Sequence, residues 1–456
     1  IRNKLIAPKA FNSEISYYES VQNNFKSPVK SLGIKHVNLK KASELLIKEE
    51  VPIENETISN STKSKLLETP FVHFHVHSQF SVLQSTSQIP TLVEAANKDN
   101  MPAIALTDKG NLMGAFHFIK AVRKHNNSLE DKSKEIKPII GCEFYVCENH
   151  NDKTRRDDGY QVVFLAKNKM GYHNLSKMSS LAYTSGFYYV PRIDKKIVEK
   201  FKENLIVLTG NLYGEVPSKI LNLGEKQAEE ALLWWKKIFK NDLYIELMRH
   251  DQEDEKRVNK GLLSFSTKHN IPVVASNNTY YTNKEDANAH DILLCLKDGE
   301  KQTTPIGRGR GFRYGLPNQE YYFKSQQQMK EIFSDIPEAI FSCSEIISKI
   351  TSFDLANDVL LPKFEIPEKF KSESNDDIER ENAYLRYLTY KGSERRYPNI
   401  SKEISERLDF ELEVISNTGY PGYFLIVQDF ISAARSMDVS VGPGSCLLYT
   451  SPSPRD

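Results

Sequence analysis

Histidine occupies every second position from His73 through His75 to His77, and apolar residues fill the positions between them. Successive side chains of a β-strand point to opposite faces, so one face would present imidazoles while the other packs on a core. A His-x-His pair on a strand can place two nitrogens around one cation such as zinc or iron. A polar strand face without a metal fits the same pattern, and the spacing alone does not separate the two interpretations.

The composition indicates a soluble globular protein, with 39% hydrophobic and 27% charged residues in a chain of 456. This length is enough for two or three domains. The formal net charge of +1 excludes an overall basic field, so any binding of nucleic acid has to come from a local patch. The five cysteines lack CxxC spacing, which argues against a disulfide framework and a structural zinc site and favours a reducing cytoplasm. We find no membrane-spanning run and no signal peptide.

The elements that would position the histidines begin after residue 69. Residues 1–69 are rich in Lys, Ser, Asn and Glu without a sustained period, which predicts a linker or the remnant of an upstream domain. Short apolar runs then predict strands over 72–77, 103–106, 139–146, 161–166, 205–209, 243–247 and 272–275. The clearest helices are expected over 112–125, 225–239, 254–269 and 284–296.

Seven β-α units in succession favour an α/β fold with a parallel sheet closed into a barrel over an open doubly wound sheet. The absence of GxGxxG after the first predicted strand weakens the dinucleotide-binding alternative. In β/α barrels the chemistry lies at the C-terminal ends of the strands. The histidine segment, as the first predicted strand, is therefore well placed to contribute to a site.

The composition changes after residue 298, where a glycine-rich loop, 307–315, carries Arg308, Arg310 and Arg313 together with aromatic residues. The arginines could grip a phosphate backbone, and a solvated turn is the alternative. Helices are expected to dominate 326–350 and 379–436. The segment 403–415 is amphipathic, with its apolar residues on one helical face.

Several motifs in order resemble the family of bacterial DNA polymerase III alpha subunits, the family C replicative polymerases. The motifs are FVHFHVHSQFS (71–81), ALTDKGNLMG (105–114), IIGCEFYV (139–146), LAKNKMGYHNL (from 165), GFYYVPRID (from 186), LTGNLYGEVP (from 208), NKEDANAHDILLC (from 283), GYPGYFLIVQDFI (419–431) and VSVGPG (439–444). The resemblance implies a polymerase and histidinol phosphatase (PHP) domain, a distorted seven-unit β/α barrel, over 70–300. It also implies the mostly helical N-terminal part of a polymerase beta-like palm over 301–444.

The resemblance places His75, His77 and Glu143 at metal-ligand positions of functional PHP sites. At six other ligand positions the residue type has changed, and these are occupied by Gln84, Lys109, Gln161, Asn211, Asn278 and Tyr280. A cluster of divalent metals needs anionic or imidazole ligands, whereas Lys109 brings a like charge. We therefore expect a structural, catalytically silent barrel without tightly bound metal, in which the remaining His and Glu are vestigial.

Four further residues look like ligands but are expected to have structural roles. Glu285, His290 and Asp291 fall in a predicted helix, where capping or surface roles are the safer interpretation. His250 follows a predicted strand and is expected to make a loop or strand-end polar contact.

The resemblance implies template-dependent nucleotidyl transfer by the intact parent, with Mg²⁺, DNA template-primer and dNTP, and with the sliding clamp and other replisome subunits as partners through regions absent here. Gly442 and Gly444 would begin the turn that binds the triphosphate. Residues 445–456 depart from the family and are expected to be a non-native tail, while the catalytic aspartates would lie beyond them. We expect a truncated, inactive fragment; a PHP-class phosphoesterase or 3′-5′ exonuclease is the alternative.

Overall fold

The computed structural model describes residues 59–307, 309–356, 363–371 and 376–442. Most of the predicted linker and all of the predicted tail, 445–456, lie outside these residues. The end of the predicted linker is helical, because α3 spans Asn60–Glu68 and buries Leu66 in the barrel core.

The barrel is built on one sheet of seven strands in the order β1-β2-β3-β5-β6-β7, with β4 paired to β2. The strands are β1 (Ala103–Leu106), β2 (Lys137–Cys147), β3 (Tyr160–Ala166), β4 (Arg192–Asp194), β5 (Leu205–Leu208), β6 (Leu243–Met248) and β7 (Val273–Ser276). Strand β3 runs antiparallel to both of its neighbours, whereas the other pairs are parallel. The prediction of an all-parallel sheet is therefore wrong at β3. A chain that returns from β2 without a crossover helix can only pair antiparallel.

The histidine segment closes the barrel between β1 and the residues that follow β7. The carbonyl of His73 accepts from the Ala105 N–H at 3.0 Å on one side, and the carbonyl of His75 accepts from the Thr279 N–H at 3.1 Å on the other. Only Val76 forms a β-bridge, to Thr279, so the predicted strand 72–77 exists as a single bridge within an extended segment. We call residues 73–77 the closing segment.

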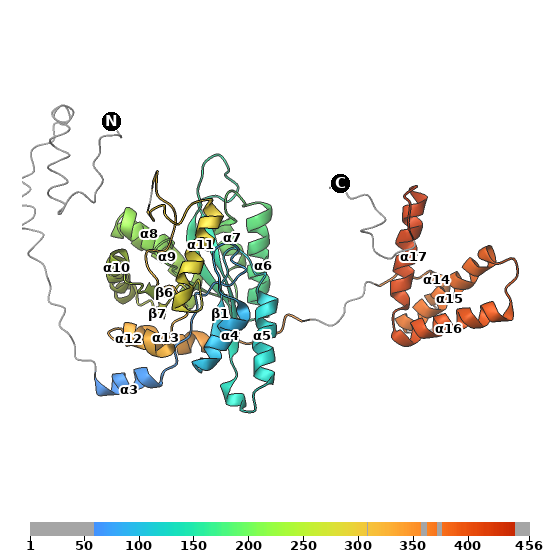
Figure 1. Cartoon of the computed structure of the whole chain (residues 1–456), viewed down its shortest axis with the longest axis horizontal. Coiled ribbons are helices and arrows are strands. Elements are labelled where there is room, and N and C mark those ends of the chain that lie inside the picture. The colour runs from blue at the N-terminus through green and yellow to red at the C-terminus, as the bar shows by residue number, and fades with distance from the viewer. Residues whose placement is uncertain (1–58, 308, 357–362, 372–375, 443–456) are drawn as a thin grey trace, which may run out of the picture. The chain divides into compact units, whose positions relative to one another are not determined.

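Helices surround the sheet, and Figure 1 shows α5 and α6 along one side and α8 to α10 along the other. They are α4 (Ile89–Lys98), α5 (Ala115–Asn127), α6 (Lys169–Thr184), α7 (Lys195–Phe201), α8 (Glu215–Asn222), α9 (Glu225–Phe239), α10 (Glu253–His269) and α11 (Ala287–Asp298), with short 3-10 turns at Lys132–Lys134, Lys240–Asp242 and Lys284–Asp286. The amphipathic face of α9, for example, buries Leu232 and Trp235. The helices predicted over 225–239 and 254–269 are confirmed.

The barrel core continues past the boundary expected at residue 300. Helices α12 (Gln326–Ile332) and α13 (Pro337–Ser348) place Phe333, Ile340 and Cys343 in the same apolar cluster as the strands. Each of these three side chains is fully buried. We therefore propose that the barrel domain extends to about residue 355.

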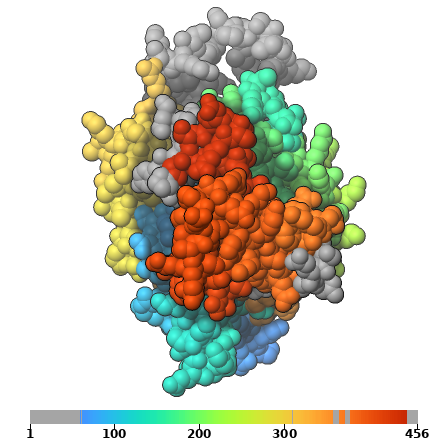
Figure 2. Space-filling model, turned by 90° about the vertical axis from the view of Figure 1, so that its right-hand side faces the viewer, coloured from blue at the N-terminus to red at the C-terminus, as the bar shows by residue number. Residues whose placement is uncertain are grey.

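The C-terminal helices pack on a small core of their own. They are α14 (Glu368–Lys371), α15 (Asp377–Arg396), α16 (Lys402–Thr418) and α17 (Pro421–Ser436), and Figure 2 shows this part in orange to red. Leu385, Leu412 and Leu425 form the buried centre, one from each long helix. The amphipathic helix predicted over 403–415 is confirmed as α16. Among the described residues, no helix is both long enough and apolar enough to cross a membrane.

A buried carboxylate joins three helices on the outside of the barrel. Glu215, at the start of α8, receives hydrogen bonds from Lys195 of α7, Lys219 of α8 and Trp235 of α9, each at 2.8 Å. Its side chain is only 5% exposed. Burial alone would raise the pKa of Glu215, but the two ammonium groups outweigh burial and hold this pKa below its usual range.

Replacing Glu215 with Gln is expected to lower the free energy of unfolding by about 2 kcal/mol near pH 7, because an amide cannot balance two ammonium groups. A depressed folded-state pKa gives stability that is complete above the unfolded-state pKa and is lost as the pH falls through the folded-state pKa. The deficit of Glu215→Gln should therefore shrink below about pH 4.5. Urea denaturation across this range measures it, with exposed Glu230→Gln on α9 as the control. An equal deficit at every pH would contradict the assignment.

Candidate functional site

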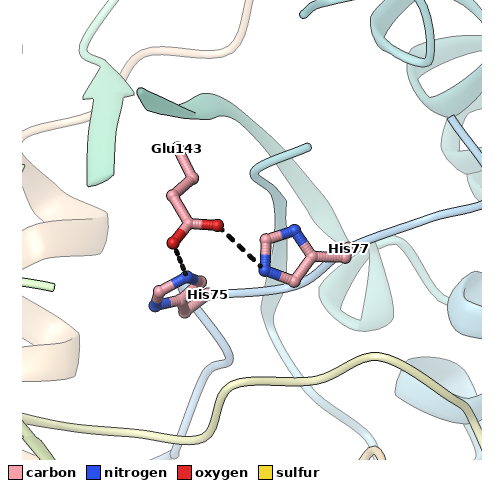
Figure 3. A group of neighbouring side chains, drawn as sticks. All are labelled: His75, His77 and Glu143. Atoms are coloured by element: carbon pink, nitrogen blue, oxygen red, sulfur yellow. Dashed lines mark ion pairs between the residues drawn. The ribbon is translucent and has the colours of Figure 1, made fainter. Parts of the chain in front are cut away.

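Three of the predicted residues meet inside the barrel. His75 and His77 project from the closing segment toward Glu143 of β2, as Figure 3 shows. The Nε2 atom of His75 lies 3.6 Å from Oε1 of Glu143, and Nε2 of His77 lies 3.4 Å from Oε2. Within the described part of the chain, these residues form the only group of His, Cys, Asp or Glu with ligand atoms close enough to share a metal ion. His73 is not part of it, because its Nε2 donates to the carbonyl of Lys324 at 2.8 Å.

His75 lies between two carboxylates. Its Nδ1 is 3.0 Å from Oε1 of Glu246, a residue of β6, and its Nε2 faces Glu143 on the other side. Burial alone would lower the pKa of His75, but Glu246 and Glu143 raise it to about 9. The imidazole is therefore protonated at neutral pH and carries a positive charge between the two acids.

Lys109 brings a second positive charge to the same carboxylate. Its Nζ lies 3.6 Å from Oε2 of Glu143 and 5.1 Å from the centre of the Tyr280 ring. Burial would raise the pKa of Glu143, but Lys109 and the two histidines hold it well below its usual range. Burial would likewise lower the pKa of Lys109, and Glu143 raises it well above the usual value. Glu143 and Lys109 are thus both charged in a fully enclosed site.

Amide side chains occupy further positions around the triad. Nε2 of His77 lies 3.1 Å from Oδ1 of Asn278, an atom that can only accept, so Nε2 carries the hydrogen. Burial lowers the pKa of His77 well below its usual value, and the imidazole is neutral. Nδ2 of Asn211 donates to Glu143 Oε1 at 3.3 Å and to Gln161 Oε1 at 2.9 Å.

The spacing of the triad suits one cation, but its charge and protonation do not. Ligand atoms about 2.1 Å from a tetrahedral zinc lie about 3.4 Å apart, and the two histidine–carboxylate distances of 3.6 and 3.4 Å are close to this value. A metal would need a lone pair on Nε2 of His77, but this nitrogen carries a hydrogen and faces Asn278. The metal would also lie beside the ammonium of Lys109. The residues as they stand therefore do not fit a resident metal ion.

The cavity next to the triad is small. It measures about 60 Å³ and is lined by residues that include Asn211, His250, Asn278, Tyr280 and Tyr321. Cavities that bind small molecules are typically several hundred Å³, whereas a water molecule takes about 30 Å³. This space has room for a few water molecules, and a phosphate ester would not fit without rearrangement.

The other candidate ligands lie outside the triad. His250 stacks on Tyr321 with ring centres 4.2 Å apart and pairs through Nδ1 with Glu255 at 2.6 Å, which confirms the expected strand-end polar contact. His290, buried in α11, lies with Nε2 2.9 Å from the carbonyl of Gln84. The backbone carbonyl of Gln84, rather than its side chain, therefore contacts His290.

Helix α11 also carries Asp291, whereas Glu285 lies in the preceding 3-10 turn rather than in the helix itself. Asp291 forms an ion pair with Arg313, so its role is structural, as the sequence predicts.

Two acidic residues of the site were not found by sequence reasoning. Glu246 is the one charged residue of buried β6. A single acidic residue within a predicted buried strand is the feature of the sequence that could have identified it. Asp108 accepts from the Ser78 N–H at 2.7 Å and from the Ser81 hydroxyl at 2.6 Å, which fixes the loop after the closing segment. Burial raises the pKa of Asp108 above its usual value.

The basic loop does not present all of its arginines to solvent. Arg313 is 5% exposed; its guanidinium forms two hydrogen bonds to Asp291, at 2.7 and 2.8 Å, and a third to the carbonyl of Thr304. Its donors are therefore used within the fold, which counts against a role of Arg313 in DNA binding. Arg310 is exposed. Arg308 lies outside the described residues, as does Gly444, whereas Gly442 is partly buried at the end of the described chain.

Comparisons with known proteins agree with the two parts of the chain. The PHP domain family matches residues 73–250, and the family described as the bacterial DNA polymerase III alpha NTPase domain matches residues 383–447. A metal-dependent phosphoesterase from Bifidobacterium adolescentis aligns with 58% of this chain and 96% of its own, at 12% identity and a TM-score of 0.32.

Curated relatives match across both parts. DNA polymerase III subunit alpha of Borreliella burgdorferi is 39% identical over 379 residues, which cover 82% of this chain and 31% of that protein. The same subunit of Treponema pallidum is 36% identical over 379 residues, covering 82% of this chain and 30% of its own. The chain spans about a third of the length of these relatives. It belongs to the family of bacterial DNA polymerase III alpha subunits, and it corresponds to their N-terminal part with the PHP domain.

Proposed function

We propose that this chain is the N-terminal part of a replicative DNA-directed DNA polymerase and that its PHP barrel supports the polymerase without catalysing a reaction. The observation that carries the proposal is the similarity to DNA polymerase III alpha subunits over 82% of the chain, which runs through both the barrel and the C-terminal helices. The intact parent would act in the cytoplasm on template-primer and dNTP with Mg²⁺. Its contacts with the sliding clamp and other replisome subunits would lie in other regions of the protein.

Nucleotidyl transfer needs metal ions held by carboxylates, which activate the primer hydroxyl and stabilise the displacement at the phosphate. The described residues of the C-terminal helices hold no group of acidic residues with metal-ligand spacing, since the triad in the barrel is the only such group found. Gly442 and Gly444 would begin the turn that accepts the triphosphate. We infer that this polypeptide does not incorporate nucleotides by itself.

A PHP-class phosphoesterase or 3′-5′ exonuclease is the second candidate, and the spacing of His75, His77 and Glu143 favours it. Against it stand the ammonium of Lys109 beside Glu143 and the 60 Å³ cavity. Both features support a structural barrel over an active one.

Primer extension with this polypeptide, a primed template, dNTPs and Mg²⁺ is expected to give no product above a reaction without protein. A full-length DNA polymerase III alpha subunit serves as the positive control. Template-dependent extension by the polypeptide would refute the inference that it lacks a polymerase centre.

The purified wild-type protein is expected to retain no stoichiometric zinc, manganese or iron, and to hydrolyse neither phosphomonoesters nor the 3′ end of single-stranded DNA. Elemental analysis after gel filtration measures the first, and release of phosphate or nucleotide measures the second. His75→Ala separates a real activity from contamination, because a reaction at this site would disappear in that variant. One tightly bound metal per chain, together with hydrolysis that needs His75, would establish the second candidate instead.

Weak DNA binding by the basic loop is expected to depend on Arg310. Arg310→Ala should reduce the slope of log K against log salt by about 0.7–0.9, the value of one lost phosphate contact. Fluorescence anisotropy over a salt series measures this slope, with the exposed Lys134→Ala as a charge-matched control. Arg313→Ala should instead lower the melting temperature, because it breaks the pair with Asp291. An unchanged slope in Arg310→Ala would remove the loop from the DNA interface.

A further inference from the structure

Three of the residues that depart from the PHP ligand pattern lie together beside the triad: Lys109, Asn278 and Tyr280. Lys109 faces Glu143 Oε2 at 3.6 Å and the Tyr280 ring at 5.1 Å. Asn278 Nδ2 is 3.3 Å from the hydroxyl oxygen of Tyr280, and the same ring stacks on His77 with centres 4.5 Å apart. These three substituted residues therefore pack together beside the carboxylate.

The triad keeps the geometry of ligands although it lacks their charge balance. Neither Nε2 of His75 nor Oε2 of Glu143 has a hydrogen-bond partner, and both atoms are buried. Unpaired buried polar atoms are costly unless a nearby charge compensates them. Lys109 is the lysine whose ammonium reaches Glu143, and it enters from residues that follow β1 rather than from the closing segment. Its side chain is 5% exposed, so water does not screen the pair appreciably.

We propose that the Lys109 ammonium serves as a tethered cation in place of a metal ion, and that removing it alone turns His75, His77 and Glu143 into a site for one divalent cation of the zinc class. This inference rests on the proposed structural role of the barrel and deepens it. The buried carboxylate of Glu143 needs a positively charged neighbour, and the side chain of Lys109 supplies one that is covalently part of the protein. Without Lys109, the same need makes the uptake of a free cation favourable. Metal binding then requires His75 to lose its Nε2 proton to solvent while Nδ1 keeps its hydrogen toward Glu246. His77 has to move its hydrogen from Nε2 to Nδ1, which a change of tautomer achieves.

The test uses the whole polypeptide with zinc chloride as the probe. Lys109→Ala is expected to retain about one zinc ion per chain after gel filtration, whereas the wild type and the exposed control Lys120→Ala retain none. Without zinc, the melting temperature of Lys109→Ala should lie about 5 °C or more below that of the wild type, because Glu143 has lost a buried partner. Added zinc should restore it. Lys109→Ala/His75→Ala should lose this zinc, which locates the ion at the triad.

A second comparison covers the case in which Lys109→Ala does not fold without metal. Glu143→Gln leaves the Lys109 ammonium buried beside an amide, and Lys109→Met/Glu143→Gln removes both charges. The double variant is expected to melt at a higher temperature than Glu143→Gln alone, because replacing both members of a buried pair costs less than removing one. A double variant no more stable than Glu143→Gln would overturn the inference.

Two results for zinc would also overturn it, and they bear differently on the proposed function. A folded Lys109→Ala variant that binds no more zinc than the wild type would contradict the tethered-cation inference and leave the structural role of the barrel intact. Stoichiometric zinc in the wild type, lost in His75→Ala, would show that Lys109 does not exclude the metal and would count against the silent barrel as well.

Discussion

Closure of the barrel by residues 73–77 is the constraint on which the rest of the structure depends. The segment hydrogen-bonds to β1 on one side and to Thr279 on the other, so it joins the first strand of the sheet to the residues that follow the last one. Because its side chains alternate, the bonds that close the ring also turn His75 and His77 inward toward Glu143. The site therefore follows from the closure of the fold, whether or not it performs chemistry.

Closure in turn creates an electrostatic problem that the surrounding residues solve. Glu143 and Glu246 bring two carboxylates into the buried interior of the barrel, where unpaired charge costs several kcal/mol. The imidazolium of His75 lies between the two acids and the ammonium of Lys109 faces Glu143. These two cations offset the charges of Glu143 and Glu246.

The sequence predicts local features better than it predicts partners. Strand β1 and helix α9 were expected at their observed bounds, because apolar runs and helical periodicity are local properties. The reversed direction of β3 was missed, since an apolar strand reads the same in either direction. Glu246 was missed because its partner, His75, lies 171 residues away in the sequence. For the same reason, composition does not reveal that Asp291 pairs with the guanidinium of Arg313.

Histidine and glutamate at PHP ligand positions are therefore weak indicators of metal chemistry in this barrel. Once Glu143 is buried, the free energy of folding alone favours cationic and hydrogen-bonding neighbours, and His75, Lys109 and Asn211 meet that need. Removing one member of such a network lowers the stability of the fold, because each removal leaves another buried charge without a partner. A site can thus retain the shape of a metal centre for reasons of stability. The charge of Lys109 distinguishes such a structural site from one that binds a metal ion.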